Sequence, residues 1–460
     1  MRLKLRGQCE ISWKHSHLPV TNEYYAKYEA ISSLLDEYPA ILSAVHRDLE
    51  RALERPEGSG DRFRYTSEQV LRVLVSQVVE GVSLRGIVVR IDDSRYLRDF
   101  VRIHEGPMMD YTTLCKLKNA IRPETWKEVN RLLARSAVEG GQIGGEELRM
   151  DTTLVETNIH WPTDSSLLWD TYRILSGILD EVRERDAEML GTRRLQRRRV
   201  KRLATRIARK SRAKGRSAKA LKSLYRRLID HVEGVCDLSR HVQKELDKVK
   251  DIPDWTTRLC NALHDTEALG RRVIDQAQRR VLHGEQVPNE EKLFSLIEPH
   301  TELVKRGKAG IPVEFGHMIQ IQQVRDKVIT DYDVFNKKPV EYTLLEPALQ
   351  SHRDLFGTYP HRMTADKAYY ESMEAITQLQ KKVKVVAIGK KGKRTEAETA
   401  REEDPFFRLA QRFRAGVEGT ISFLKRVLGL SRCLNKGWDH FQATVGSTIF
   451  VHNLLVLARR

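Results

Sequence analysis

The chain has 460 residues, of which 40% are hydrophobic and 31% are charged, and its formal net charge is +17. This length allows two or three domains with buried cores. No apolar run reaches the ~18 residues that span a bilayer, and the basic first residues lack the apolar stretch of a secretory signal. We therefore expect no membrane association. The positive charge predicts a polyanionic partner, and nucleic acid is the first candidate.

Five cysteines are scattered along the chain, with no CxxC pair and no cysteine–histidine cluster at zinc spacing. Chains of this kind usually keep their thiols reduced in the cytoplasm. We expect buried free thiols and no structural zinc.

The first third of the chain predicts helices. We expect an N-terminal helical segment over 1–60 and a helical, DNA-binding-like domain over 61–140. The second domain starts at a capping box, residues 66–69, and a later helix presents Thr113 and Lys116. A helix after a short turn can enter the major groove, so we expect these two side chains to contact DNA. An ordinary amphipathic helix is the alternative.

A glycine-rich joint at 140–145 separates these helices from an apolar strand over 148–155, which carries Asp151. The joint lacks the lysine and threonine of a phosphate-binding loop, so we interpret it as a linker. The strand opens the first part of a catalytic domain, to which we assign residues 146–185.

Residues 186–285 form a basic helical insertion, in which apolar residues follow a coiled-coil spacing of 3.5 residues. Inside it, residues 191–228 contain 17 lysines and arginines and no acidic residue. A solvated linker is one interpretation of such a stretch. We favour a surface that binds the phosphate backbone of a nucleic acid. The side chains expected to contact DNA are Arg197, Arg198, Arg199, Lys201 and Arg202.

The remainder of the catalytic domain, 286–460, has a mixed α/β pattern. A short strand ends directly before Asp366, and the chain from Pro405 to its end is predicted to be helical. Arg414, Glu418 and Lys425 follow one another at offsets of 4 and 11 residues, which places them on one helical face. The alternative for this helix is a solvated face with ion pairs between successive turns.

Three acids, Asp151, Asp366 and Glu418, suit one metal-dependent chemistry. Carboxylates from two neighbouring strands and a packed helix are able to share two divalent cations. The two basic neighbours of Glu418 would hold phosphate oxygens, and Lys367 beside the second acid would do the same. Asp333, on a predicted strand, is the first substitute for a misassigned acid, and we leave His160 open between a structural and a direct role.

The order of these elements resembles the ribonuclease-H-like fold of DDE transposases. Residues 151–153 and 158–168, with the pattern D-T-T and then N-I-H-x-P-T-D-S-x-L-L, are similar to transposases of bacterial insertion sequences of the ISNCY type. Residues 364–370 resemble the second-acid motif of that family. Residues 414–425 match most of its tyrosine–arginine–glutamate–lysine signature, with Gln411 at the tyrosine position.

The resemblance implies an α/β ribonuclease-H-like catalytic domain, an α-helical N-terminal domain, and a long, coiled-coil-like helical insertion after the first strand. It also implies a DNA transposase in which the three acids hold two Mg²⁺ (or Mn²⁺) ions for phosphodiester cleavage and strand transfer at terminal inverted repeats. The expected partners are double-stranded DNA, from transposon ends and target, and a second copy of the chain in a homodimeric synaptic complex. The expected location is the bacterial cytoplasm, at the nucleoid.

Two alternatives remain. One is a non-catalytic, basic coiled-coil protein that binds DNA through its charge while its acids are structural. The other is a ribonuclease-H-like nuclease that cuts DNA without transferring strands.

Overall fold

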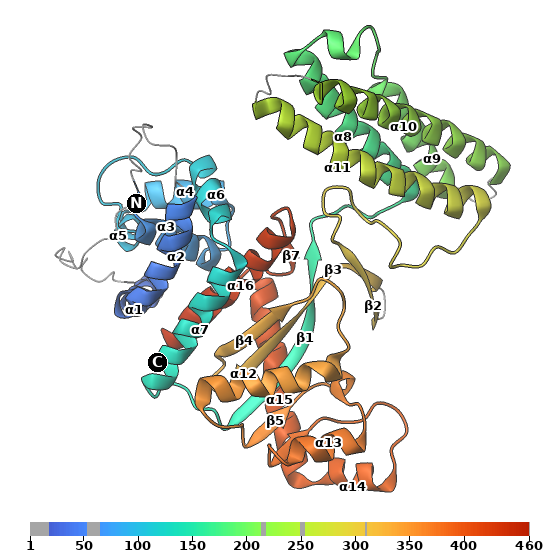
Figure 1. Ribbon diagram of the computed structural model, residues 1–460. Helices are drawn as coiled ribbons and strands as arrows, with labels where there is room; N and C mark the ends of the chain where they lie inside the picture. Colours follow the sequence, from blue (N-terminus) through green and yellow to red (C-terminus); the bar gives the residue numbers. More distant parts are fainter. Residues whose placement is uncertain (1–17, 53–64, 213–217, 249–253, 309–310, 460) are drawn as a thin grey trace. The chain divides into compact units, whose positions relative to one another are not determined.

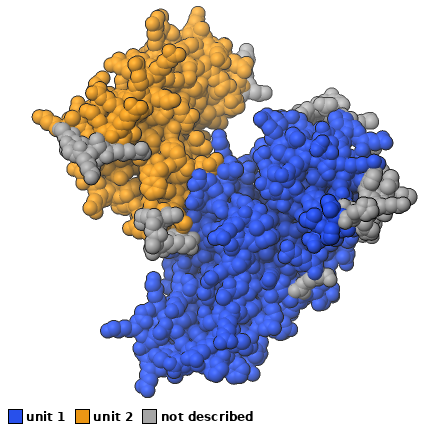
Figure 2. Space-filling model, turned by 180° about the vertical axis from the view of Figure 1, so that it is seen from behind, with its two compact units in different colours: residues 1–157, 316–460 blue, residues 158–315 orange. Residues whose placement is uncertain are grey.

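The protein is described by a computed structural model that covers residues 18–52, 65–212, 218–248, 254–308 and 311–459. The chain forms two compact units (Figure 2). Unit 1 combines residues 1–157 with 316–460, and unit 2 comprises residues 158–315. A search of the described helices found none with the length and apolar character needed to cross a membrane.

Seven helices form the N-terminal part of unit 1, and their apolar faces share one core with strands and helices from the C-terminal part. The capping box expected at Thr66 is confirmed: its hydroxyl accepts from the Gln69 backbone, and the Gln69 side chain accepts from the Thr66 backbone. The helices are α1 (Pro19–Glu37), α2 (Pro39–Arg51), α3 (Ser67–Val79), α4 (Leu84–Asp93), α5 (Arg95–Phe100), α6 (Tyr111–Ala120) and α7 (Pro123–Glu139).

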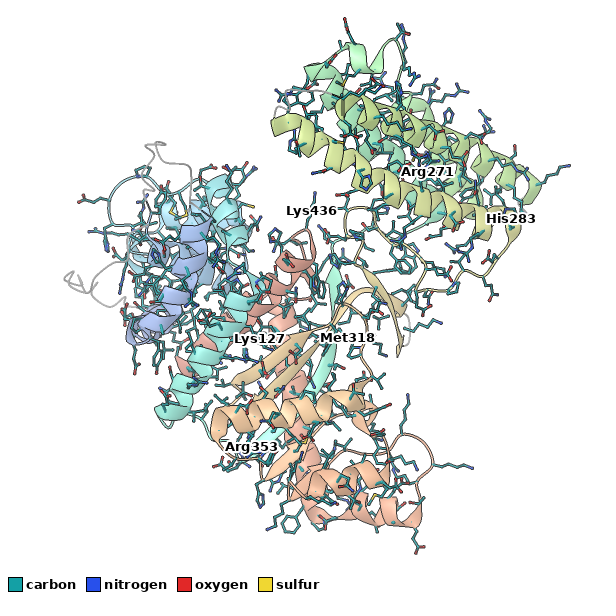
Figure 3. All side chains as sticks on the ribbon, viewed as in Figure 1. Lys127, Arg271, His283, Met318, Arg353 and Lys436 are labelled. Carbon is teal, nitrogen blue, oxygen red and sulfur yellow. The ribbon has the colours of Figure 1, made fainter. Side chains whose placement is uncertain are left out.

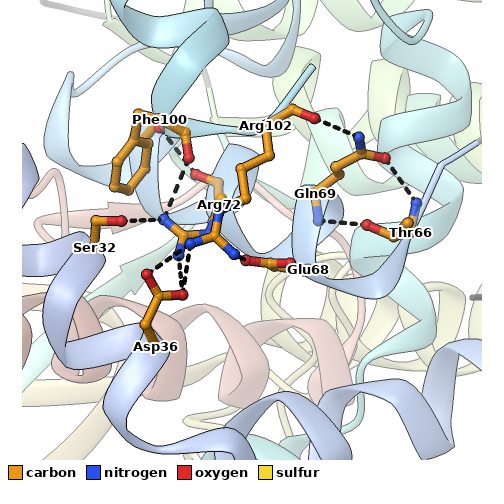
Figure 4. A network of polar contacts seen from close by, with 9 residues as sticks. Ser32, Asp36, Thr66, Glu68, Gln69, Arg72, Phe100 and Arg102 are labelled. Carbon is orange, nitrogen blue, oxygen red and sulfur yellow. Dashed lines mark hydrogen bonds and ion pairs between the residues drawn. The ribbon is translucent and has the colours of Figure 1, made fainter. Parts of the chain in front are cut away.

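A buried arginine ties three of these helices together (Figure 4). Arg72 on α3 is 1% exposed and donates to Glu68 on its own helix, to Asp36 on α1, and to the Phe100 carbonyl at the end of α5. Arg102 pairs with the same two carboxylates. A buried charge is costly unless its partners satisfy it. This network therefore favours one fixed packing of the three helices.

Unit 1 contains most of a mixed, seven-stranded sheet with the order β2-β3-β1-β5-β6, in which β4 also pairs with β3 and β7 with β1 (Figure 1). The central strand β1 runs antiparallel to β3 and parallel to β5, and β5 runs parallel to β6. The strands are β1 (Glu147–Thr157), β2 (Glu302–Lys308), β3 (Ile311–Val324), β4 (Ile329–Val334), β5 (Arg362–Thr364), β6 (Val385–Ala387) and β7 (Arg432–Cys433).

Helices cover both faces of this sheet, with α12 in front and α15 behind in Figure 1. Successive side chains of a strand point to opposite faces. On β1, Leu148 and Met150 join the core of α12 and α13, whereas Arg149 and Asp151 contact α15. The C-terminal elements are η3 (Glu341–Leu344), α12 (Leu345–Phe356), η4 (Lys367–Tyr369), α13 (Met373–Gln380), α14 (Glu396–Glu403), α15 (Pro405–Arg426) and α16 (Trp438–Leu457).

Unit 2 is mainly helical and has its own apolar core. Helix α8 begins at a capping box formed by Thr163 and Ser166. Its apolar residues share the core of the three following helices, so the structure groups α8 with unit 2, whereas the sequence analysis assigns 146–185 to the catalytic domain. The helices are α8 (Asp164–Arg185), η1 (Glu188–Leu190), α9 (Arg197–Arg212), α10 (Ala218–Leu246), α11 (Asp254–Ala277) and η2 (Gln278–His283).

Candidate active site

Two of the three acids lie at the same edge of the sheet because of strand register. Arg149 of β1 pairs with Thr364 of the parallel strand β5. Asp151 lies two positions further along β1, and Asp366 lies two positions beyond the end of β5, near enough for its charge to raise the pKa of Asp151. Asp151 still belongs to β1, whereas Asp366 caps the 3₁₀ helix η4, where its carboxylate accepts from the Lys367 backbone at 2.7 Å.

Helix α15 brings the third acid to this edge. Glu418 points into solvent, with its side chain 63% exposed, and accepts from Nη2 of Arg414 at 3.1 Å. Nη1 of the same arginine lies 3.8 Å from Oδ2 of Asp151, within ion-pair distance. Arg414 therefore connects the acid on the helix to the acid on β1.

The position of α15 over β1 is set by a buried arginine that the sequence analysis missed. Arg149 donates from Nε to Gln323 on β3 at 2.8 Å and from Nη1 to the Phe413 carbonyl on α15 at 2.9 Å. Gln323 is also hydrogen-bonded to Thr420 at 2.9 Å. These contacts lie one residue before Arg414 and two residues after Glu418 on the helix, so they hold this part of α15 against the strands that carry Arg149 and Gln323.

The same contact requires a glycine on α15. A Cβ at residue 416 would lie 2.0 Å from Nη1 of Arg149, which is closer than a real Cβ contact. Gly419, three residues further on, has no atom within 4 Å of a Cβ added there. The close approach of helix and strand therefore depends on Gly416. A charged residue inside the apolar strand was the only sequence signal for Arg149.

Electrostatics distinguish Asp151 from an ordinary surface carboxylate. The pKa of Asp151 is raised to about 6, first by burial and then by the nearby charges of Asp366 and Glu418, while the Thr152 backbone and Arg414 lower it. The Thr152 N–H donates to Asp151 Oδ1 at 2.8 Å. Because burial is the main cause of the raised pKa, with the neighbouring acids second, the ionised Asp151 carboxylate would be stabilised by an added cation.

The three carboxylates are suitable ligands for a divalent metal ion, but their side chains do not converge on one position. In the ranges that the structure describes, no three His, Cys, Asp or Glu side chains are close enough to hold a metal ion. Glu418 is paired with Arg414 and is exposed, so rotation of its side chain is unobstructed by a core. Carboxylate oxygens are the ligands that Mg²⁺ prefers. Asp151 and Asp366 thus form the fixed part of the site, and Glu418 the adjustable part.

The remaining predicted phosphate ligands of unit 1 lie on the same elements. Lys367 is exposed directly after Asp366, and its Cε lies 3.5 Å from the position of a Cβ added to Gly389. Lys425 is half-buried in the last turn of α15, where its carbonyl accepts from Ser431 at 2.9 Å. Lys367 thus follows the second acid directly, and Lys425 lies seven residues after the third acid on the same helix.

Asp333, the substitute acid predicted on a strand, lies on β4 and forms a salt bridge. Lys127 of α7, labelled in Figure 3, lies 3.0 Å from Asp333 and 2.6 Å from Asp331. Asp331 is buried, and although burial raises its pKa, Lys127 lowers the pKa below the ordinary value. This pair fixes α7 against β4, and neither acid is among the charges that act on Asp151.

The predicted DNA contacts of α6 and α9 are mostly accessible. On α6, Thr113 is half-buried and Lys116 is exposed. Helix α9 buries Val200, Leu203 and Ile207 on one side, and its exposed side chains include Arg198, Arg199, Lys201 and Arg202.

Two residues of unit 2 are held by aspartates. Arg197, also predicted to contact DNA, pairs with Asp180 at 2.8 Å, so this guanidinium is engaged within the unit. His160 is 58% exposed and lies 3.5 Å from Asp170. The contact gives His160 a partner on α8.

One family comparison bears on this arrangement. Residues 320–454 match the family model described as the transposase DDE domain. The match begins within β3 and includes Asp366, Arg414 and Glu418, but it does not reach Asp151 on β1. No curated protein and no solved structure matches the chain.

The match of residues 320–454 supports a DDE transposase of an insertion sequence, as the resemblance in the motifs also indicates. A DDE domain implies a ribonuclease-H-like fold, in agreement with the mixed α/β sheet. Proteins of that family are transposases that act on DNA and use divalent metal ions.

Proposed function

We propose that this protein cleaves phosphodiester bonds at the terminal inverted repeats of its insertion sequence and transfers the freed strands into target DNA. One observation carries the proposal: Asp366, which follows the strand that pairs with β1, lies near enough to act on the charge of Asp151, and Arg414 connects Asp151 to Glu418. Acids from separate elements that meet at one exposed edge are suited to metal-dependent phosphoryl transfer.

Asp151, Asp366 and Glu418 would hold two Mg²⁺ (or Mn²⁺) ions. Bound Mg²⁺ lowers the pKa of an attacking water and stabilises the departing oxygen of a phosphodiester. Asp151 must lose its proton to act as a ligand, which its raised pKa allows at neutral pH. When Glu418 turns towards the aspartates, Arg414 is released to pair with a DNA phosphate.

Lys367 and Lys425 would position the phosphates on either side of the acids. In unit 2, the exposed side of α9 would provide a backbone-binding surface, with Arg198, Arg199 and Lys201 among its cations. Such contacts supply affinity without reading sequence. On α6, Thr113 and Lys116 would contact bases or phosphates.

The helical unit after β1 would be an insertion in the catalytic domain. Its coiled-coil-like seams are compatible with pairing of two copies, and synapsis of two DNA ends favours a homodimer. We place this activity in the bacterial cytoplasm, at the nucleoid.

The test uses purified protein, Mg²⁺ or Mn²⁺, and the DNA that flanks the reading frame. Strand cleavage and joined products are separated on denaturing gels. Asp151→Asn, Asp366→Asn and Glu418→Gln should each abolish cleavage while DNA binding is retained. Asp333→Asn is the matched control and should keep cleavage, because its carboxylate pairs with Lys127.

The products distinguish the alternatives. Cleavage followed by joining supports the transposase. Cleavage without any joined product would indicate a nuclease. DNA binding without cleavage in either metal would indicate a binding protein and overturn the proposal, as would full activity in any of the three acid variants.

A further inference from the structure

A basic loop between β6 and α14 leaves the sheet beside the acids. Thr364 of β5 pairs with Ala387 of the parallel strand β6. Beyond these strand ends, a Cβ placed on Gly389 would lie 3.5 Å from Cε of Lys367, the residue that follows Asp366. In the sheet, β6 is two strand spacings from β1, which is about 10 Å. The loop is thus a neighbour of the candidate active site.

Two glutamates of α14 fix the base of this loop. The Lys390 ammonium lies 2.9 and 2.8 Å from the two carboxylate oxygens of Glu398, which is 4% exposed. The Lys390 backbone donates to Glu402 at 2.7 Å, and Arg394 pairs with Glu402 at 2.9 Å. The first and last cations of the loop are therefore neutralised, and the path of the backbone between them is constrained.

The contacts of Glu398 and Glu402 leave the middle of the loop positively charged. Lys391 and Lys393 are exposed on either side of Gly392, whose φ of +89° forms a turn that favours glycine. In the described part of the chain, neither ammonium forms an ion pair or a side-chain hydrogen bond. Lys367 also lies at the start of the loop, with its Cε 3.5 Å from a Cβ position on Gly389. Like charges held together in this way repel one another unless a polyanion neutralises them.

We propose that Lys391 and Lys393 bind backbone phosphates of the DNA strand that enters the active site. The inference rests on the proposed function and adds a second DNA contact to it. Phosphates repeat about every 3.4 Å along a strand axis. The loop would therefore contact the backbone roughly three nucleotides from the reacting phosphodiester, at the distance estimated from the strand spacing. Contacts of this kind fix the position of the strand and carry no sequence information.

The chain offers a matched control on the same strand. Lys381 and Lys384 are exposed and precede β6, whereas Lys391 and Lys393 follow it. The two pairs therefore lie at opposite ends of β6, with equal charge. If the loop lysines act only as solvated surface charges, the two pairs should contribute equally to DNA binding.

The test compares the full-length wild type with the double variants Lys391→Ala/Lys393→Ala and Lys381→Ala/Lys384→Ala. Binding to a random-sequence DNA duplex is followed by fluorescence anisotropy over a series of KCl concentrations. Loss of two phosphate contacts should reduce the salt-dependence slope by about 1.8 and weaken binding on the order of tenfold at low salt. The control should keep the wild-type slope. Thermal unfolding should show equal stability for the two variants.

Two outcomes overturn the inference in different ways. If the wild type binds and cleaves DNA but the loop variant keeps the slope of the control, the loop contact is wrong and the proposed function stands. If the wild type neither binds nor cleaves DNA, the proposed function fails and the loop contact fails with it. A second readout is cleavage of the flanking DNA, in which the loop variant should raise KM while kcat is retained.

Discussion

The guanidinium of Arg414 lies between two carboxylates from different elements, 3.1 Å from Glu418 on its own helix and 3.8 Å from Asp151 on β1. It lowers the pKa of Asp151, whereas the neighbouring acids raise it. Without metal, Arg414 is therefore the cation that partly compensates this edge of the sheet. We expect metal binding to free Arg414 for a phosphate.

Replacement of Arg414 should move the pH dependence of cleavage. In Arg414→Ala, Asp151 loses a neighbour that lowers its pKa, so a higher pH is needed to ionise the carboxylate. The acidic limb of the rate profile should shift to higher pH, and KM for DNA should rise about tenfold for a lost charge-assisted contact. Arg412→Ala, an exposed neighbour on α15, is the control. An unchanged acidic limb in Arg414→Ala would contradict the assignment.

Asp151 should reduce the stability of the metal-free protein at neutral pH. Its pKa is about 6 in the folded state and about 3.9 in an unfolded chain, so the folded state binds more protons between these values. The free energy of unfolding therefore decreases as pH rises from about 4 to 6. Asp151→Asn should be more stable than wild type by roughly 1–2 kcal/mol at pH 7, with the gain lost near pH 4. Urea unfolding at both pH values measures this, and a variant that is less stable at pH 7 would refute the argument.

Binding of a divalent metal should restore the stability that the ionised Asp151 costs the wild type, and it should have little effect on Asp151→Asn. A ligand that binds only the folded state stabilises it by about 2.7 kcal/mol at 100 times its Kd. Because protons compete for the carboxylates, Mg²⁺ should raise the melting temperature more at pH 7 than at pH 5. Asp151→Asn should respond weakly at both values. A comparable response in wild type and variant would place the metal elsewhere.

Two glycines of α15 should respond in opposite ways to alanine. Gly416→Ala places a Cβ against the Arg149 guanidinium and should destabilise the protein by about 1–3 kcal/mol, with lower cleavage activity because the helix shifts away from β1. Gly419→Ala meets open space and should stabilise the helix by up to about 1 kcal/mol. Thermal unfolding and cleavage rates measured on both variants provide the comparison. Equal effects would argue against the close packing of helix and strand.

The local settings of the three acids could be predicted from the sequence around each of them. The apolar strands that precede Asp151 and Asp366 were predicted, and they are β1 and β5. The helical period of 3.6 residues also places Arg414 and Glu418 on one face, and their 3.1 Å contact agrees with it. These features depend on residues close in sequence, so periodicity is enough to find them.

Contacts between distant segments were not predictable in this way. The parallel pairing of β1 with β5 joins residues more than 200 positions apart, and the link from Arg149 to α15 depends on how the helix packs. The two-residue strand β7, at 432–433, lies in a region expected to be helical; it exists because it pairs with the end of β1. Isolated periodicity contains no information about such partners.

The most direct test is a crystal structure of the protein with DNA and Mn²⁺, in which anomalous scattering locates the metal ions. We predict anomalous peaks between the carboxylates of Asp151 and Asp366, at coordination distances of about 2.2 Å, with Glu418 turned away from Arg414 to join them. Peaks beside Asp331 and Asp333 instead, or an Asp151 that touches no metal in the DNA complex, would contradict the account.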